Sequence, residues 1–430
     1  MKYLTRTADS ILQDLLDAFG AVLIEGPKWC GKTTTAEQVA KSVIKMQDPD
    51  LRDEYLATAQ SKPSLLLIGD TPRLIDEWQD APVLWDAVRT MVDKRVVPGQ
   101  FILTGSNAVD KSQIRHSGTG RIVKMNMLPM SLWESKESTG EVSLRQLFAN
   151  PDYDIDGCQS NMSVEDLIFA ACRGGWPASL VSRKPKSQLL IARNYVRTVC
   201  SEDISRIDGI KRNEKLTMLI LRSYARNIST LAKKTNMLAD VISSEEVECS
   251  MDTFSDYVDA LERLFVIQDI EAWCPTIRSK TVIRSSPKRG FCDPSIAVAL
   301  LGLTPEALSV QLKTFGFIFE QMCVRDMKAY TQGLYSHVSY YRDRYGLEAD
   351  FVLHLDDGKY ALVECKLGSK EIEEGAGHLL ELKRLISQHN EQEKQIPIPE
   401  PNLLIVLTGG KMAYTRPDGV KVIPLGCLKD

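Results

Sequence analysis

The stretch GPKWCGKT, residues 26–33, decides the fold of the first part of this 430-residue chain. A glycine, four residues and then Gly-Lys-Thr form the spacing of a P-loop. The preceding residues, 21–24, are apolar and few enough for a buried strand. The residues from 34 to about 42 have a helical pattern, with Ala36, Val39 and Ala40 on one side. This order of strand, loop and helix is the context that a P-loop requires.

The chemistry expected of this loop is the binding of a nucleoside triphosphate. Backbone amides of such a loop point inward and cradle phosphate oxygens. We expect Lys32 to reach the β- and γ-phosphates and the Thr33 hydroxyl to ligate Mg²⁺. The residues expected around the nucleotide are Gly26, Pro27, Lys28, Trp29, Cys30, Gly31, Lys32, Thr33 and Thr34.

A second motif, RLIDE at residues 73–77, brings apolar residues into two adjacent carboxylates. In P-loop ATPases an acidic residue at a strand end holds Mg²⁺, and Asp76 is placed for that role. A neighbouring glutamate orients and deprotonates the attacking water, so Glu77 is the expected catalytic base.

A third predicted strand ends in small polar residues at 104–107. One of Thr104, Ser106 or Asn107 is expected to lie beside the P-loop and sense the γ-phosphate, and Asn107 is counted among the nucleotide-binding residues. An ordinary Gly-Ser-Asn turn explains the same residues, and the sequence leaves both interpretations open.

Composition bounds the class of protein. The chain is too long for one core, so two or three domains are expected, and 43% apolar with 26% charged residues is ordinary for a globular protein. No apolar run approaches the length of about eighteen residues needed to span a membrane, and no secretory signal is visible. Ten scattered cysteines without a C-x-x-C pair favour reduced thiols in a cytoplasmic protein.

Charge is unevenly distributed along the chain. The formal net charge is −4, yet the segment between Arg173 and Asp240 contains fourteen Lys/Arg and five Asp/Glu. Such a basic segment is expected to face phosphates, an acidic subunit or solvent, and the sequence does not separate the three.

The predicted fold class is α/β in three parts. Residues 1–135 form a P-loop ATPase domain with a parallel sheet, 136–310 a helical region, and 311–430 an α/β domain. The strands expected in the first part lie at 21–25, 43–47, 73–77, 100–105 and 121–127.

The middle part is expected to contain a winged-helix-like module. Helices over 216–226, 230–238 and 252–264 precede a predicted strand over 265–272. The third helix would enter a DNA groove in such a module, but it carries four carboxylates and one arginine. Because carboxylates repel a polyanion, we expect this module to be structural or to bind protein.

A second cluster of charged residues is predicted near the C-terminus, after a helix through Phe315, Phe319 and Met322. Strands over 349–355 and 359–366 flank a three-residue loop, 356–358, that ends in glycine. This loop length places Asp350 directly opposite Glu364, with apolar residues on the other face. Side chains so opposed lie about 4.5–5.5 Å apart at Cβ, close enough to share a divalent metal.

These residues resemble the PD-(D/E)xK arrangement of restriction-endonuclease-like folds: Asp350, then Glu364-Cys365-Lys366. The resemblance implies metal ligands at Asp350 and Glu364 and a lysine, Lys366, that positions the attacking water. Glu320 on the preceding helix matches the additional acidic residue that this family often places near the metal. One departure is that Ala349, not proline, precedes Asp350.

The chain as a whole resembles a family of bacterial and archaeal AAA+ type ATPases with an uncharacterised nuclease-like C-terminal domain. The resemblance rests on the motifs above, on LTGS at 103–106, on Gly120-Arg121 before PMS at 129–131, and on GGWP at 174–177. It implies ATP and Mg²⁺ as cofactors. It also makes Arg121 a candidate for contacting the γ-phosphate, in the same subunit or a neighbouring one.

Two hypotheses of function follow. The first is an ATP-hydrolysing P-loop ATPase that couples its nucleotide state to a C-terminal nuclease-like domain, with metal-dependent cleavage of nucleic acid. The alternative is a nucleotide-dependent switch or scaffold that binds protein and keeps an inactive nuclease-like fold. A metabolite kinase would share the P-loop but leaves Asp76, Glu77 and the hairpin unexplained. Nucleic acid and protein both stand as partners, no membrane is expected, and the oligomeric state stays open.

Overall fold

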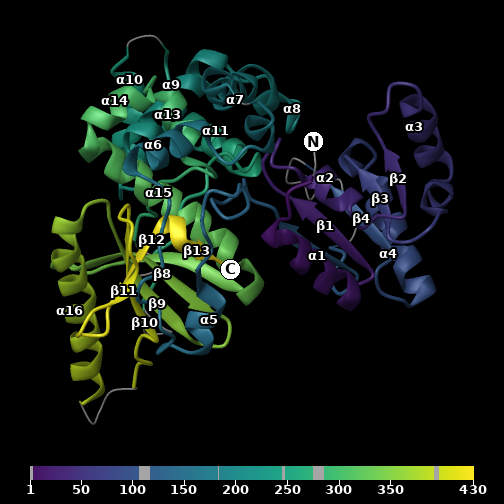
Figure 1. Cartoon of the computed structure of the whole chain (residues 1–430). Coiled ribbons are helices and arrows are strands. Elements are labelled where there is room, and N and C mark those ends of the chain that lie inside the picture. Colours follow the sequence, from purple (N-terminus) through teal and green to yellow (C-terminus); the bar gives the residue numbers. More distant parts are fainter. Residues whose placement is uncertain (1–2, 106–116, 183, 245–246, 275–284, 392–396) are drawn as a thin grey trace.

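The computed structural model describes residues 3–105, 117–182, 184–244, 247–274, 285–391 and 397–430. Figure 1 shows an N-terminal α/β part that stands beside a helical region, and below the helices a C-terminal part built on a second sheet. Within the described residues, no helix is long and apolar enough to cross a membrane. This is the predicted α/β fold class, with the P-loop sheet, the helical middle and the C-terminal mixed sheet in the predicted order.

The N-terminal sheet is entirely parallel, with strand order β2-β3-β4-β1-β5. Its central strands are buried on both faces, which is why their sequences are nearly continuous apolar runs. All five strands lie where the sequence predicts them: β1 Ala21–Glu25, β2 Ser42–Lys45, β3 Arg73–Asp76, β4 Phe101–Thr104 and β5 Ile122–Asn126.

Helices cover both faces of this sheet. One face carries Val22 and Ile24 and packs against α1 (Thr7–Ala18) and α2 (Lys32–Glu37). The other carries Ala21 and Leu23 and packs against α3 (Arg52–Ser61) and α4 (Val83–Arg95). The alternation follows from the two-residue period of a strand. The helix expected to run to about residue 42 is shorter, since α2 ends at Glu37.

The middle part is helical, as predicted. Side-chain caps at Ser163, Asn213 and Ser250 begin three of its helices. Its α-helices are α5 Leu144–Ala149, α6 Val164–Arg173, α7 Pro185–Thr198, α8 Ile204–Arg206, α9 Glu214–Arg226, α10 Lys234–Ile242, α11 Met251–Arg263, α13 Pro294–Leu300 and α14 Pro305–Val310, and the π-helix Val199–Asp203 joins α7 to α8.

The winged-helix-like prediction holds for its helices but not for its strand. The three expected helices are α9, α10 and α11. The strand predicted over 265–272 is absent from the described residues, where three isolated bridges replace it: Ile267 to Phe291, Ile270 to Lys288 and Ala272 to Tyr340. Three separate bridges leave no continuous ladder, and Val266 and Ile267 of the apolar run are buried in the core.

The C-terminal part is a six-stranded mixed sheet of order β11-β12-β10-β9-β8-β7. The long helix α15 (Leu312–Thr331) packs on one face and α16 (Ile372–Asn390) on the other. The helix predicted through Phe315, Phe319 and Met322 is α15, and the strands predicted over 349–355 and 359–366 are β8 and β9. The strands are β7 Ser336–Arg342, β8 Glu348–Leu355, β9 Tyr360–Lys366, β10 Leu403–Thr408, β11 Tyr414–Thr415 and β12 Lys421–Pro424, while β13 Leu428–Lys429 pairs with β6 Val142–Ser143 outside this sheet.

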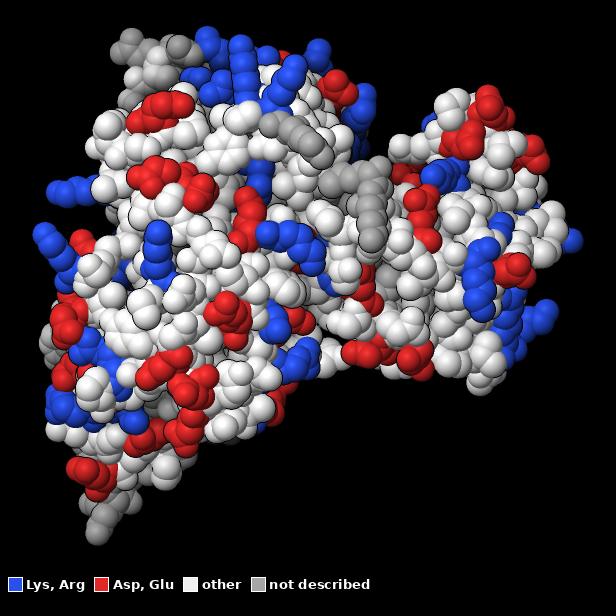
Figure 2. All heavy atoms as spheres, viewed as in Figure 1, with Lys and Arg blue, Asp and Glu red and all other residues white. Residues whose placement is uncertain are grey.

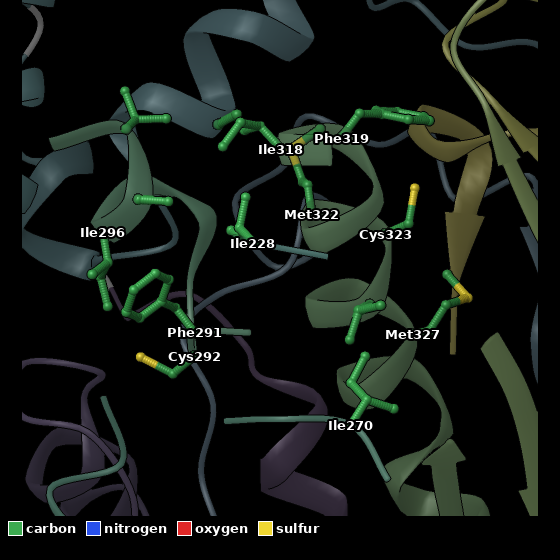
Figure 3. Close-up of a cluster of buried hydrophobic side chains, with 14 of the residues drawn as sticks. Ile228, Ile270, Phe291, Cys292, Ile296, Ile318, Phe319, Met322, Cys323 and Met327 are labelled. Carbon is green, nitrogen blue, oxygen red and sulfur yellow. The ribbon is translucent and has the colours of Figure 1, made fainter. Parts of the chain in front are cut away.

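The helical region and the C-terminal sheet share one hydrophobic core. Figure 3 shows Ile318 and Met322 of α15 in the same cluster as Phe291 and Ile296 of the helical region. Because α15 also packs on β7, β8 and β9, the two parts form one packed body. The boundary proposed between residues 310 and 311 falls at this shared core and stays a prediction.

Candidate functional site

The P-loop connects the end of β1 to the start of α2, and its two glycines fit only as glycines. Gly26 has φ 149°, and a Cβ there would lie 2.2 Å from the carbonyl oxygen of Met127. Gly31 has φ 103°, a conformation that other residues rarely adopt. Trp29 also has a positive φ, 65°. The loop is therefore held in a tight path that a side chain at position 26 would disrupt.

Lys32 is buried at the start of α2, and its side chain bends back over the loop. Nζ donates to the carbonyl oxygens of Gly26, at 2.9 Å, and Pro27, at 2.8 Å. These two neutral carbonyls are the acceptors that hold the ammonium. A phosphate group at the loop would give it charged acceptors instead, and such hydrogen bonds are stronger.

Thr33, Asp76 and Thr104 meet at one edge of the sheet. Because β3, β4 and β1 are parallel neighbours, their C-terminal ends lie together. Thr33 Oγ1 donates to Asp76 Oδ1 at 2.7 Å, and Thr104 Oγ1 donates to the same oxygen at 2.5 Å. The sequence-predicted pair of metal ligands, Thr33 and Asp76, is thus brought into contact. Of the sensor candidates, Ser106 and Asn107 lie outside the described residues.

Glu77 follows β3 in an unusual backbone conformation. Its φ is 54°, in the left-handed region that a glutamate seldom occupies. Its carboxylate accepts a hydrogen bond from the amide of Gln79. Burial raises the pKa of Glu77, although Gln79 and Lys32 oppose that rise. A carboxylate held by an amide and made more basic by burial suits a general base.

The outer side of the P-loop contacts the helical region. Lys28 Nζ lies 2.6 Å from Asp203 Oδ1 on the π-helix that follows α7. The ring of Trp29 meets Tyr195 of α7 edge to face, with centroids 5.8 Å apart. Tyr195 in turn stacks on Trp176 at 4.4 Å. Lys28 and Trp29, two neighbouring residues of the P-loop, therefore connect the predicted nucleotide-binding loop to the helical region.

The inner side of the loop is anchored by Arg6, which the sequence does not single out. Its guanidinium donates to the carbonyl oxygens of Cys30 and Leu128, each at 2.8 Å. It also pairs with the buried Glu134 at 3.0 Å. Burial opposes ionisation of Glu134, but Arg6 and the Ser131 amide lower its pKa. No local motif marks Arg6, because its partners lie far along the chain.

Arg121 lies at the opposite edge of the sheet from the P-loop. It precedes Ile122, which pairs with Ala21 at the start of β1, whereas the P-loop leaves the other end of β1. The length of that strand, about 13 Å, separates the two edges. Arg121 Nε instead donates to Asp93 of α4 at 2.8 Å. The expectation of a γ-phosphate contact within the same subunit is therefore corrected, and a contact in a neighbouring subunit stays a prediction.

In the C-terminal part, β8 and β9 pair in the predicted register. Phe351 lies opposite Val363, which sets Asp350 across from Glu364. Gly358, with φ 87°, closes the three-residue loop. The apolar face packs into the shared core, as expected. The face with the carboxylates is not open, however, because α16 covers it.

A buried lysine lies between two of the predicted metal ligands. Lys288 Nζ is 2.7 Å from Glu320 Oε1 and 3.7 Å from Asp350 Oδ1, and it donates to the Asp350 carbonyl oxygen at 2.9 Å. Burial alone would lower the pKa of Lys288, but the Glu320 and Asp350 carboxylates raise it above its usual value. The lysine is therefore a fixed positive charge in this cluster.

The third predicted ligand has other partners. Glu364 Oε2 pairs with Lys366 Nζ at 3.0 Å, and Oε1 lies 3.7 Å from Nδ1 of His378 on α16. In the part of the chain that the structure describes, no three His, Cys, Asp or Glu side chains gather as a metal-binding group. Joint ligation of one metal by Glu320, Asp350 and Glu364 does not fit this arrangement, because Lys288 occupies the place between the first two.

Three families match successive parts of the chain. Residues 18–136 match the family described as an AAA domain. Residues 164–307 and 315–428 match two domains of unknown function, DUF8612 and DUF4143. Together with the P-loop and the parallel sheet, the first match supports an AAA-type P-loop ATPase in the N-terminal part.

Relatives and solved structures resemble larger parts of the chain. An uncharacterized protein of Mycobacterium tuberculosis is 24% identical over 369 residues, covering 83% of this chain and 72% of the relative. An uncharacterized protein of Haemophilus influenzae is 23% identical over 269 residues, covering 62% and 60%. The Walker-type ATPase of Pyrococcus abyssi is 14% identical, covers 70% of this chain and 96% of that one, and has a TM-score of 0.41. The Aeropyrum pernix ORC1 protein, solved in complex with DNA, is 12% identical, covers 72% and 94%, and has a TM-score of 0.25.

Proposed function

We propose that the N-terminal part binds ATP with Mg²⁺ and hydrolyses it. The observation that carries this proposal is the contact of Thr33 with Asp76, 2.7 Å apart at the end of the P-loop. A hydroxyl and a carboxylate so placed offer oxygen ligands to one hard cation. The buried ammonium of Lys32 lies at the same loop. Its hydrogen bonds to the carbonyl oxygens of Gly26 and Pro27 can be replaced by hydrogen bonds to phosphate oxygens.

Each residue then has a defined role. Lys32 binds the β- and γ-phosphates, and Thr33 and Asp76 hold the cation, while Thr104 fixes the Asp76 carboxylate by its hydrogen bond. Bound Mg²⁺ supplies neutralisation of the charge that develops on the transferred phosphoryl group. Glu77 orients the attacking water and accepts its proton, with Gln79 setting the direction of the carboxylate.

Removal of Mg²⁺ is expected to stop phosphate release. Metal-ion stabilisation of a phosphoryl transition state contributes several kcal/mol, so EDTA or Asp76→Asn should lower the rate at least about hundredfold. Release of inorganic phosphate from ATP measures this. Asp53→Asn, at an exposed carboxylate of α3, is the matched control and should keep the wild-type rate. Hydrolysis that persists unchanged in EDTA would contradict the metal role.

We also propose that the nucleotide state is transmitted to the rest of the chain. Lys28 and Trp29 belong to the loop that binds phosphate, and both contact the helical region through Asp203 and Tyr195. A ligand that repositions the loop must change these contacts. The helical region shares its core with α15 and the C-terminal sheet. Contiguous packing therefore connects the helices that contact the P-loop to the C-terminal sheet.

For the C-terminal part, the contacts of Lys288 favour the second hypothesis, in which the nuclease-like fold is retained but does not cleave nucleic acid. An ammonium between Glu320 and Asp350 supplies the positive charge that a metal would bring. Lys366, the lysine expected to position water, is paired with Glu364. We therefore propose that these charges form internal ion pairs, and that the domain serves as a docking part of a nucleotide-dependent switch.

Incubation with plasmid DNA or structured RNA is expected to leave both intact in the presence of ATP and Mg²⁺ or Mn²⁺. Gel electrophoresis measures strand integrity, and Asp350→Ala serves as the comparison. The two proteins should give the same pattern, because Asp350 is already engaged by Lys288. Metal-dependent cleavage by the wild type that disappears in Asp350→Ala would establish the first hypothesis instead.

A further inference from the structure

The helical region presents a basic face that neither the nucleotide site nor the C-terminal cluster uses. It is formed by α7, α8, α9 and the connection between α8 and α9, and Figure 2 shows Lys and Arg side chains gathered over this part of the molecule. Six exposed residues define it: Arg193, Arg197, Arg206, Lys211, Lys215 and Arg222.

The elements that carry these residues lie next to one another. α9 packs against the π-helix that follows α7, so Arg222 and Arg197 come from adjacent segments. On α9, Lys215 and Arg222 are seven residues apart and share one side of the helix. On α7, Arg193 and Arg197 are four residues apart, a spacing at which like charges destabilise a helix. The stability of the fold therefore does not account for this pattern.

The carboxylates of this segment are largely engaged elsewhere. Asp203 binds Lys28 of the P-loop, and Asp208 pairs with the buried Arg212. Glu202 pairs with Arg206 at 2.9 Å, and Glu214 is an exposed carboxylate in the first turn of α9. Six Lys and Arg against the exposed Glu202 and Glu214 leave the face with a positive excess toward solvent. The acidic helix α11 packs against α9, and its Asp256 pairs with the buried Arg212.

We propose that this basic face binds the phosphate backbone of nucleic acid. Lys and Arg side chains on neighbouring helices match a row of phosphates and gain free energy by releasing condensed counterions. The basic face lies on other elements than α11, the helix that would enter a DNA groove in a winged-helix module. Binding of nucleic acid to this face does not require that the C-terminal part cleaves nucleic acid. It also does not depend on ATP hydrolysis, so the two proposals fail separately.

Fluorescence anisotropy with labelled DNA and RNA duplexes of about 20 base pairs tests this proposal. The triple variant Arg197→Glu, Lys211→Glu, Arg222→Glu should bind at least about tenfold more weakly at low salt. Its plot of log affinity against log salt should be flatter by about 2 to 3, since each lost phosphate contact removes about one from the slope. The corresponding triple glutamine variant, with a smaller charge change, should show the same direction.

The control variant places the same three charge reversals on other parts of the surface: Lys62→Glu, Lys370→Glu and Lys411→Glu, all at exposed positions. It should bind within about threefold of the wild type, and all variants should keep the wild-type rate of ATP hydrolysis. Equal losses in both triple variants, or an unaffected basic-face variant, would overturn the proposal. Wild-type protein that binds polyglutamate but neither duplex would overturn it in favour of an acidic protein surface.

Discussion

Replacing Lys32 with alanine is expected to abolish detectable ATP binding. In the structure its ammonium is buried and donates to the carbonyl oxygens of Gly26 and Pro27, two neutral acceptors that phosphate oxygens can replace. Hydrogen bonds to charged groups contribute about 1.5–3 kcal/mol each. Loss of two of them corresponds to at least about hundredfold weaker binding, at 1.4 kcal/mol for each factor of ten.

The comparison for this variant is Lys41→Ala, at an exposed lysine shortly after α2. Titration of a fluorescent ATP analogue should give the wild-type affinity for Lys41→Ala and no saturation for Lys32→Ala. Circular dichroism establishes that both are folded. A folded Lys32→Ala protein with unchanged affinity would remove the phosphate-binding role from this loop.

Changing Glu77 to glutamine is expected to separate binding from turnover. The amide keeps the shape of the side chain but cannot accept a proton from water, and general-base catalysis contributes about 10²- to 10⁴-fold to a rate. The rate of phosphate release should fall by that factor, while the affinity for ATP stays near that of the wild type. Glu77 lies at the end of β3 beside the metal ligand Asp76, so the change leaves the phosphate-binding loop in place.

Glu54→Gln, at an exposed position of α3, is the matched control and should hydrolyse ATP at the wild-type rate. Turnover by Glu77→Gln equal to that of the control would show that another group activates the water. Joint loss of binding and turnover would instead indicate that Glu77 supports the fold of the site, through its hydrogen bond with Gln79.

Local patterns in the sequence were sufficient to predict much of this architecture. The P-loop is encoded by two glycines at fixed spacing, and the structure shows that Gly26 has no space for a side chain. The register of the C-terminal hairpin follows from its loop length, because a shift of one residue would turn the apolar face outward. The contact of Thr33 with Asp76 follows from parallel strands whose ends meet at one edge.

The residues that the sequence did not reveal act over long separations. Arg6 anchors Cys30 and Glu134, Asp203 pairs with Lys28, and Lys288 lies between two carboxylates of the C-terminal part. None of these belongs to a local motif, since only the folded chain brings the partners together.

The two incorrect predictions, for Arg121 and for the strand over 265–272, also result from packing between distant parts of the chain. Arg121 precedes a correctly predicted strand, yet the direction and order of the strands put it at the far edge of the sheet. The apolar run at 265–267 suits a strand, but it has no partner of matching length within the described residues. Tertiary packing, which a single sequence encodes only indirectly, decided both outcomes.

Isothermal titration calorimetry of the purified wild-type protein with ATP in the presence of Mg²⁺ tests the central claim most directly. The account predicts a saturable heat with about one nucleotide per chain, because the chain has one P-loop with Lys32, Thr33 and Asp76 in place. Lys32→Ala provides the baseline. The absence of heat on titration with ATP, ADP or GTP would contradict the account.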